Sequence, residues 1–294
     1  MVHPKCKVCL SENTVHLFDS FNTHGRKIID EEDKFQVFKC GDCGLVFLND
    51  LEANQDYYDR YYQPDYYKDS CKNIGIFKSF LKVLSKFSTN RKQKIIFRSL
   101  KNKVNKPHLL LDIGCGTGEF LESLDSSKFD GYGCEVNESG YKSCIKKGLK
   151  VHKGELHNIG FRGKKFDVVT LWHVLEHIED PVKLFRKIRE ILSKDGILLF
   201  QVPNTDSLGF RIGKEWWFHM DSPRHLALYN KKSLRELCKV TGFEITSVKN
   251  EFYDYPLDLF WSIRKSKLRF FIYPFYIIFK MLSKEHLTFI CKKK

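Results

Sequence analysis

Hydrophobic residues fall into short continuous runs, separated by stretches with an apolar residue at every third or fourth position. Continuous runs at 109–111, 166–171 and 197–202 have the length and composition of strands that are buried on both faces. Positions 182–192 and 233–240 repeat at helical spacing. Strands that alternate with helices in this way predict an α/β fold built on a parallel sheet.

Four further segments complete the predicted sheet. Residues 129–135 and 151–155 are expected to form its second and third strands, because each is a short segment that ends at a turn. Residues 243–249 alternate in polarity like a half-buried strand, and 287–291 is the expected antiparallel partner at the sheet edge. The sequence therefore predicts seven strands in one sheet.

A glycine-rich turn follows the first apolar run. Asp112 ends the run, and Gly114, Gly116 and Gly118 then alternate before a helical pattern begins. Glycines at such a strand-to-helix turn let a nucleotide approach the backbone at the carboxyl edge of a sheet. Position 119 is Glu119 instead of the glycine of a dinucleotide fingerprint, and no Lys-Ser/Thr pair follows, which excludes a Walker loop. Asp112 would repel a pyrophosphate but could hold a cation.

This motif resembles the first motif of the class I S-adenosylmethionine-dependent methyltransferases. The resemblance implies an α/β, Rossmann-like seven-stranded sheet and methyl transfer from S-adenosylmethionine, whose sulfonium, ammonium and ribose suit an acidic, glycine-lined site. Glu135 ends the second strand, where this architecture places an acid for the ribose hydroxyls. The family also implies adenine contacts from Glu155 and the Leu156 backbone. The predicted cofactor-binding residues are Asp112, Gly114, Cys115, Gly116, Gly118, Glu135, Glu155, Leu156 and Trp172.

Residues 172–181 strengthen the resemblance, because Trp-His-Val-Leu-Glu-His-Ile-x-Asp-Pro is common in this family. His173 follows a strand's carboxyl end, where it either accepts a proton from the methyl acceptor or packs beside the methionine moiety and orients it. His177 is a second catalytic candidate. His173, Glu176 and His177 also spell an inverted zinc-protease signature. We reject that interpretation, because the motif follows a buried strand and no third ligand is evident.

Residues 204–230 are the predicted substrate lid. Trp216 and Trp217 suit stacking on a sugar or base, and Arg224 suits a phosphate or carboxylate through its planar guanidinium group. His219 and His225 are further base candidates. The alternative is a buried connection whose Trp and Arg side chains are satisfied internally. Pro-Arg-His-Leu also recurs in the resembled family, so Arg224 and His225 could instead be architectural.

Two Cys-x-x-Cys pairs predict a small zinc ribbon over residues 1–50. Cys6, Cys9, Cys40 and Cys43 would supply four thiolates, which fill a tetrahedral Zn²⁺ shell and make the site structural. The alternatives are a redox pair or chance spacing. With no export signal after Met1, the ten cysteines are expected to be thiols and metal ligands instead of disulfides.

Residues 51–106 are the predicted connector, first tyrosine-rich and then basic. No Asp or Glu occurs between Lys72 and Lys106, and apolar spacing there predicts two amphipathic helices that are separated near Asn90. The tyrosines either form a wall over the substrate or pack on the catalytic domain, which spans 107–294. The order of cysteine pair, tyrosines and glycine motif resembles bacterial methyltransferases found with surface-polysaccharide and sugar biosynthesis.

The net charge of +14 predicts an anionic partner. Lipid headgroups, RNA phosphates or an anionic substrate would each suit the basic helices. The apolar and basic insertion at 257–282 is too short to span a bilayer, so it either covers the pocket, contacts a second copy or lies on a membrane surface. We therefore expect a cytoplasmic protein that either stays free or lies at the inner membrane face. The sequence does not determine its oligomeric state.

Three functions follow from these features. The first is S-adenosylmethionine-dependent methylation of an oxygen or nitrogen in a sugar-containing small molecule or glycan. The second is RNA methylation, which the charge and the cysteine lobe favour. The third is a non-catalytic interaction protein that docks through its zinc ribbon.

Overall fold

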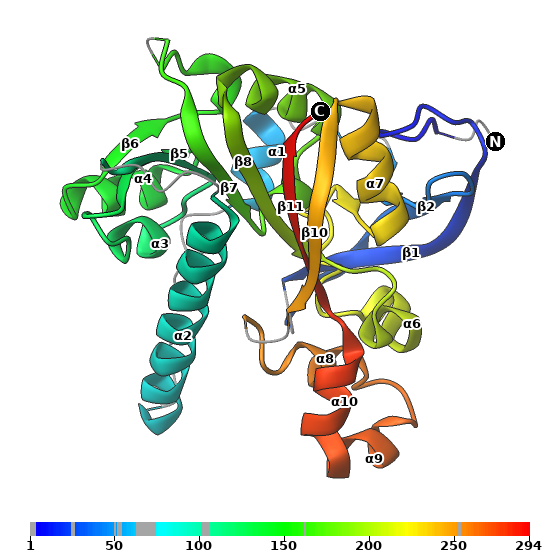
Figure 1. Ribbon diagram of the computed structural model, residues 1–294. Helices are drawn as coiled ribbons and strands as arrows, with labels where there is room; N and C mark the ends of the chain where they lie inside the picture. The colour runs from blue at the N-terminus through cyan, green and yellow to red at the C-terminus, as the bar shows by residue number, and fades with distance from the viewer. Residues whose placement is uncertain are drawn as a thin grey trace.

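The computed structural model describes residues 4–24, 27–49, 51, 55–62, 75–100, 106–161, 163–251 and 254–294. These residues form a four-stranded sheet and a seven-stranded sheet with helices around them (Figure 1). Tyr66 and Tyr67 of the predicted tyrosine-rich segment lie outside the described residues.

The larger sheet has the predicted seven strands. Its order is β10-β11-β8-β7-β4-β5-β6, and β4, β5, β6, β7 and β8 pair in parallel. Strand β11 runs antiparallel to both β10 and β8, so β10 forms the edge. The α/β, Rossmann-like prediction is confirmed. The strands are β4 (His108–Ile113), β5 (Phe129–Glu135), β6 (Lys150–Lys153), β7 (Phe166–Trp172), β8 (Leu192–Pro203), β10 (Phe243–Glu251) and β11 (His286–Lys293).

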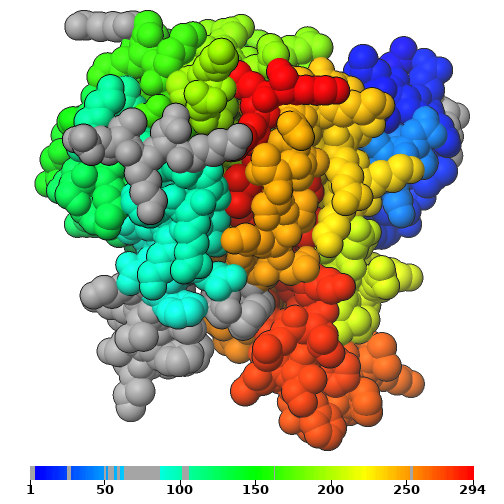
Figure 2. Space-filling model, viewed as in Figure 1, coloured from blue at the N-terminus to red at the C-terminus, as the bar shows by residue number. Residues whose placement is uncertain are grey.

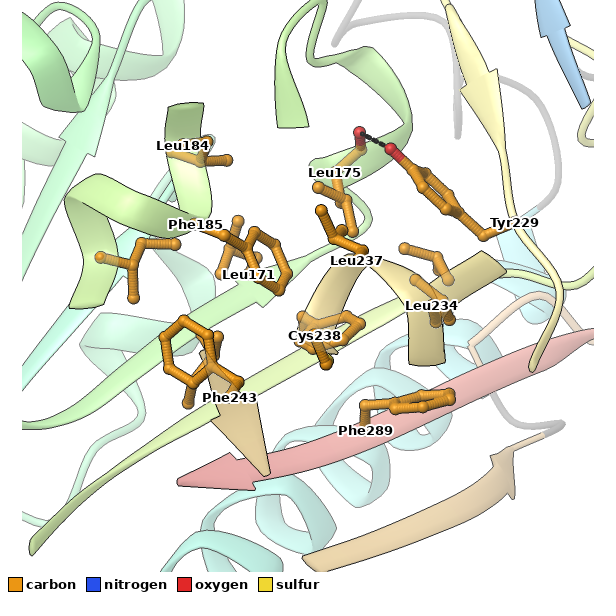
Figure 3. Close-up of a cluster of buried hydrophobic side chains, with 14 of the residues drawn as sticks. Leu171, Leu175, Leu184, Phe185, Tyr229, Leu234, Leu237, Cys238, Phe243 and Phe289 are labelled. Atoms are coloured by element: carbon orange, nitrogen blue, oxygen red, sulfur yellow. Dashed lines mark hydrogen bonds between the residues drawn. The ribbon is translucent and has the colours of Figure 1, made fainter. Parts of the chain in front are cut away.

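Helices α5 (Pro181–Ile191) and α7 (Lys231–Val240) cover one face of this sheet. Figure 3 shows their apolar side chains packed over β7, β8 and β11. Phe185 of α5 contacts Phe200 and Phe243 at centroid distances of 5.2 and 5.8 Å. Burying such rings removes apolar area from water and fixes both helices on the sheet.

The opposite face is covered by α2 (Gly75–Ser99), α3 (Glu119–Glu122) and α4 (Glu138–Lys146). Ile95 and Ile96 of α2 are buried with Leu110 and Phe120 in one cluster. The prediction of two basic helices is wrong, because α2 is continuous and Asn90 lies inside it. An asparagine costs a helix interior well under about 1 kcal/mol, so packing of the neighbouring turns outweighs it.

The N-terminal lobe is built on the smaller, antiparallel sheet. It contains β1 (Thr14–His24), β2 (Lys27–Cys40), β3 (Val46–Leu48) and, from the predicted lid, β9 (Ala227–Leu228). One hydrophobic cluster includes Cys6, Val8 and Phe47 of this lobe together with Leu175 and Tyr229. The lobe and the lid therefore share both a sheet and a core.

The remaining helices are short. Helix α1 (Gln55–Tyr61) follows β3, with the Tyr57 hydroxyl donating to the Pro223 carbonyl at 3.1 Å. Helices α8 (Asp258–Ser262), α9 (Arg269–Ile272) and α10 (Tyr276–Ser283) form a lobe beyond the end of β10 and the start of β11, and α6 (Leu208–Gly213) packs beside it (Figure 1). Short 3₁₀ turns lie at η1 (Leu156–Asn158), η2 (Leu175–His177), η3 (Lys214–Trp216) and η4 (Tyr273–Phe275). Among the described residues, no helix has the length and apolar character needed to cross a bilayer.

Candidate active site

The three glycines after β4 have different roles. All have positive φ angles, at 65° for Gly114, 55° for Gly116 and 79° for Gly118. A Cβ at Gly114 would lie 2.6 Å from Val174, and one at Gly118 would lie 2.5 Å from Leu149. A Cβ at Gly116 would meet no heavy atom within 4 Å. Gly114 and Gly118 therefore permit close packing of the turn, whereas Gly116 borders open space.

Glu135 stands beside Gly116 at the end of β5. Its carboxylate accepts the Gly116 amide at 2.8 Å and the Asn137 amide at 2.7 Å. Burial raises the pKa of Glu135, although these amides oppose that effect. An ionised carboxylate has about four acceptor positions, so about two stay available for further hydroxyl donors. This is the geometry that the sequence analysis expects for a ribose site.

We call the region at the carboxyl ends of β4 and β5, around Gly116 and Glu135, the crevice. Asp112, near the end of β4, is a second buried acid beside it. Its carboxylate accepts the Thr170 hydroxyl at 2.7 Å. Burial raises its pKa to about 7, while the Thr170 hydrogen bond and the charge of Lys92 act in the opposite direction. An additional positive charge here would stabilise the ionised form, because it offsets the cost of desolvation.

An aromatic side chain and a lysine lie next to these acids. Trp172 ends β7 and contacts Phe120 edge to face at a centroid distance of 5.4 Å. The Lys92 ammonium of α2 lies 4.7 Å from the centre of the Trp172 ring and 3.2 Å from Asp254. The indole nitrogen of Trp172 is buried without a hydrogen-bond partner among the described residues.

The other predicted cofactor residues differ in side-chain direction and in exposure. The Cys115 thiol points back toward β5, because a Cβ at Gly133 would lie 2.8 Å from its sulfur. A cofactor contact from Cys115 would therefore use its backbone. Glu155 is exposed just before η1, and Leu156 is buried. Both lie beyond the carboxyl end of β6, beside β5, on the side expected for adenine.

His173 has the strongest signs of a catalytic role among the four candidate histidines. It follows β7 directly and has a φ angle of 57°, an unfavourable conformation for a residue with a side chain. Its Nε2 lies 3.4 Å from Asp254, and its Nδ1 lies 3.6 Å from Glu176. Burial alone would lower the pKa of His173, but these carboxylates outweigh it and raise the pKa.

The other three histidines have structural partners. His177 Nδ1 lies 2.9 Å from the Tyr62 hydroxyl and 3.0 Å from the Arg224 carbonyl. His219 Nε2 lies 3.1 Å from Asp258, and His225 Nδ1 lies 2.7 Å from the His219 carbonyl. Burial lowers the pKa of all three, to about 4 for His225. Their contacts favour an architectural role over the base role that the sequence suggested.

The motif around Glu176 contains a ligand arrangement that the sequence analysis missed. We expected no third ligand for Glu176 and His177, but the structure brings His225 to them, with ligand atoms of all three within 4.8 Å of one another. The sequence does not indicate that His225 is close to η2, because the lid is far from η2 along the chain. Both oxygens of Glu176 are buried without a hydrogen bond among the described residues, and nearby imidazoles lower the pKa of Glu176 against the effect of burial.

Two of the three residues predicted to contact the substrate are buried and have protein partners. Trp217 is only 2% exposed, and its indole nitrogen donates to Glu285 at 3.0 Å. Arg224 is buried, with its guanidinium group donating to Asp221, the Thr23 carbonyl and the Tyr61 carbonyl. Both side chains hold the lid against the N-terminal lobe, as the architectural alternative predicts. Trp216 is half-buried against Phe21 and lies near Arg264 and Lys265.

Asp254 and Lys92 are site residues that the sequence analysis did not identify. Asp254 joins α2 to the site through Ser88, Lys92 and His173. Lys92 lies in a run of similar basic residues, and Asp254 lies in a loop without a motif. Their importance comes from tertiary contacts, which spacing along the chain does not report.

The four N-terminal cysteines converge in space. Sulfur atoms of Cys6 and Cys43 are 3.5 Å apart, as are those of Cys9 and Cys40, and all four lie within 4.8 Å of one another. Two similar knuckles bring them together, with the Leu10 amide donating to the Cys6 carbonyl and the Gly44 amide to the Cys40 carbonyl. A tetrahedral Zn²⁺ with bonds of about 2.3 Å needs sulfurs about 3.8 Å apart, which this cluster can supply.

Comparison with known proteins identifies the family of this chain. Residues 82–248, more than half of the chain, match a family model described as a methyltransferase domain. The chain belongs to this family. It is an S-adenosylmethionine-dependent methyltransferase, and the third, non-catalytic interpretation is wrong.

Relatives of this methyltransferase act in different settings. Ubiquinone biosynthesis O-methyltransferase of Haemophilus ducreyi is 25% identical over 170 residues, which are 52% of this chain and 72% of that protein. A plantazolicin methyltransferase in complex with a substrate analogue and S-adenosylhomocysteine has a TM-score of 0.55 at 17% identity, covering 81% of this chain and 94% of that one. Magnesium protoporphyrin IX methyltransferase of Synechocystis has a TM-score of 0.51 at 14% identity, covering 82% and 96%. These structural matches show the shared fold.

The crevice of the methyltransferase fits S-adenosylmethionine. Gly116 has no side chain to cover its backbone, and the Glu135 carboxylate beside it can accept further hydrogen bonds. The unpartnered Trp172 nitrogen and the buried Asp112 lie along the same strand ends. When bound, the cofactor supplies the methyl group and the positive charge that makes it reactive.

Proposed function

We propose that this methyltransferase modifies an oxygen or nitrogen of a sugar-containing small molecule or glycan. The observation that carries an O- or N-directed reaction is His173, whose backbone has a positive φ angle and whose imidazole, 14% exposed, lies between two carboxylates. Hydroxyl and amine acceptors lose a proton as they gain a methyl group, and a histidine can accept that proton at neutral pH.

Most of the rate enhancement comes from positioning in this proposal. Gly116 and Glu135 hold one reactant, and the elements around His173 hold the other. Correct alignment of two reactants can contribute up to about 7–11 kcal/mol, and a positioned base adds about 10²–10⁴-fold. Asp254 orients the imidazole through a hydrogen bond to Nε2, whereas Glu176, 3.6 Å from Nδ1, contributes its charge. The Tyr62 hydroxyl, near His177, gives the same region a polar aromatic group.

The sugar-containing class rests on a resemblance, because the order of the cysteine pairs, tyrosines and glycine motif resembles that of bacterial methyltransferases found with surface-polysaccharide and sugar biosynthesis. The ubiquinone and plantazolicin methyltransferases among the relatives support a small-molecule acceptor in general. Neither Trp217 nor Arg224 supports the sugar assignment, because both are buried in the lid. RNA remains the second candidate because the net charge is +14.

Transfer of tritiated methyl groups into fractionated cell extract tests the acceptor class. We expect label in the glycan, nucleotide-sugar or lipid-linked pool, with turnover that changes little with salt. Label that RNase removes, together with binding that weakens steeply with salt, would instead support RNA methylation. The matched control is the Glu135→Ala protein, which should transfer much less label to either pool because it binds the cofactor more weakly.

A structural Zn²⁺ in the N-terminal lobe is part of the proposal. Its ligands are Cys6, Cys9, Cys40 and Cys43, and the converging sulfur atoms support it. Binding of this kind can contribute on the order of 10 kcal/mol of folding free energy. Because the lobe shares a sheet and a core with the lid, the ion would also stabilise the lid.

Removal of the metal should therefore lower thermal stability strongly. We expect about one zinc per purified chain by elemental analysis. Chelation should lower Tm strongly, because the four thiolates would lose the metal ion that they share. Cys40→Ala should lose the metal. Cys238→Ala should retain it, because Cys238 lies elsewhere, 3.7 Å from Cys291. A metal-free protein with unchanged Tm would contradict this assignment.

A further inference from the structure

The lobe formed by α8, α9 and α10 has an exposed apolar surface. Eight exposed large apolar side chains lie within residues 268–282. We define the apolar tip as Phe270, Phe271, Phe275, Ile277, Ile278 and Leu282. Phe270 is 71% exposed and Ile277 is 75% exposed. Figure 2 shows that this lobe protrudes from the body of the molecule. Apolar side chains this close together on a protruding element indicate an interaction surface.

The inner side of the lobe is well packed. Leu259, Ile263 and Ile272 are buried together, and α6 packs against them through Leu208 and Ile212. Asp258 and Lys280 form a buried ion pair that joins α8 to α10. The lobe is therefore a folded element with one apolar side inside and another outside, so the exposed side is not explained by loose packing.

Basic residues accompany the apolar tip. Lys265, Lys267 and Lys284 are exposed, and Arg264 and Arg269 are partly exposed. No Asp or Glu occurs from Leu259 to Lys284. Trp216 lies beside this group, with the Lys265 ammonium 4.7 Å from the centre of its ring. Apolar side chains with a cationic and aromatic border are typical of protein elements that lie in a membrane interface.

Position in the fold connects this surface with the active site. The lobe lies between the end of β10 and the start of β11, and His286 of β11 pairs with Pro203 at the carboxyl end of β8. The lobe therefore lies at the same sheet edge as His173 and Glu135. Figure 1 shows α2, whose sequence lacks acidic residues, extending toward the same side of the sheet as the lobe.

We propose that the apolar tip inserts into the surface of an anionic lipid bilayer. Charge favours this partner over a second copy of the chain, because a symmetric contact would bring the same basic residues against each other. The lengths of α9 and α10 also favour a membrane surface. Both helices are too short to span a bilayer, but they can bury an apolar side at its surface. The enzyme would then work on an acceptor presented at that surface.

Vesicle co-sedimentation of the full chain tests the proposal. We expect the protein to bind vesicles that contain phosphatidylglycerol at least about tenfold better than vesicles of phosphatidylcholine alone, with weaker binding at high salt. Phe271→Asp combined with Ile278→Asp should abolish binding. Ile145→Asp, at an exposed apolar position of α4, should leave it unchanged.

Two readouts separate failure of the proposal from failure of the fold or the enzyme. The Phe271→Asp/Ile278→Asp protein should retain the Tm and S-adenosylhomocysteine affinity of the parent, since both side chains are more than half exposed. Equal binding to the two kinds of vesicle, or none, would overturn the proposal. If the parent protein forms dimers without lipid and the double substitution dissociates them, the proposal is overturned. The apolar tip would then bind a second copy of the chain. None of these results depends on which acceptor is methylated.

Discussion

Glu135→Ala should weaken S-adenosylhomocysteine binding on the order of 10²–10⁴-fold. The Glu135 carboxylate already accepts the amides of Gly116 and Asn137, and its remaining acceptor positions are those available to the ribose hydroxyls. A hydrogen bond to a charged group contributes about 1.5–3 kcal/mol, and two such bonds account for a loss of this size. Isothermal titration calorimetry measures the affinity directly.

Glu138→Ala is the matched control for this substitution. Glu138 lies three residues further along, at the exposed start of α4, where it pairs with Lys142 at 3.1 Å and with Lys153. Exposed pairs of this kind contribute little to stability, so cofactor affinity should stay near that of the parent protein. A Glu135→Ala protein with intact Tm and parental affinity would place the ribose elsewhere.

His173→Ala should lower kcat by about 10²–10⁴-fold and leave S-adenosylhomocysteine affinity unchanged. His173→Gln separates the two roles that the sequence left open. Glutamine can keep a hydrogen bond to Asp254 but cannot accept a proton at neutral pH. If His173 acts as the base, both substitutions reduce kcat to a similar extent. Near-parental activity in the His173→Gln protein would show that His173 orients its neighbours instead.

The pH dependence of kcat/KM should follow the same histidine. A base must be neutral, so the rate should rise with pH through the pKa of His173, which Asp254 and Glu176 raise above its usual value near 6.5. Asp254→Asn removes one of these carboxylates and lowers that pKa. The acidic limb of the profile should then move to lower pH. An unchanged limb would show that a group other than His173 sets it.

Sequence patterns predicted the elements of this molecule better than their contacts. Runs of apolar residues located β4, β7 and β8, because burial on both faces leaves a signal in the local sequence. Alternating polarity and short segments that end at turns located the other strands of the sheet. The glycine motif and the end of the second strand likewise predicted Gly116 and Glu135 as site residues, and the structure brings the two within hydrogen-bond distance. In contrast, the sequence predicts a break near Asn90, whereas the packing of Ile95 and Ile96 keeps α2 continuous.

Residue type alone did not separate binding from architecture in the lid. Trp217 and Arg224 have the chemistry of substrate contacts, but Glu285 and Asp221 already satisfy them. Glu285 lies 68 residues from Trp217 along the chain, whereas Asp221 lies only 3 residues from Arg224. Only the second pair is local in the sequence. Asp254 gives the reverse case, because a residue without any motif becomes a neighbour of His173 through folding.

A crystal structure with S-adenosylhomocysteine is the most direct test of the central claim, that the crevice at Gly116 and Glu135 delivers a methyl group toward His173. The account predicts ribose hydroxyls bonded to the Glu135 carboxylate, the adenosine against Gly116, and the sulfur directed toward the His173 side of the crevice. A ligand bound away from Glu135, or a sulfur directed away from His173, would contradict it.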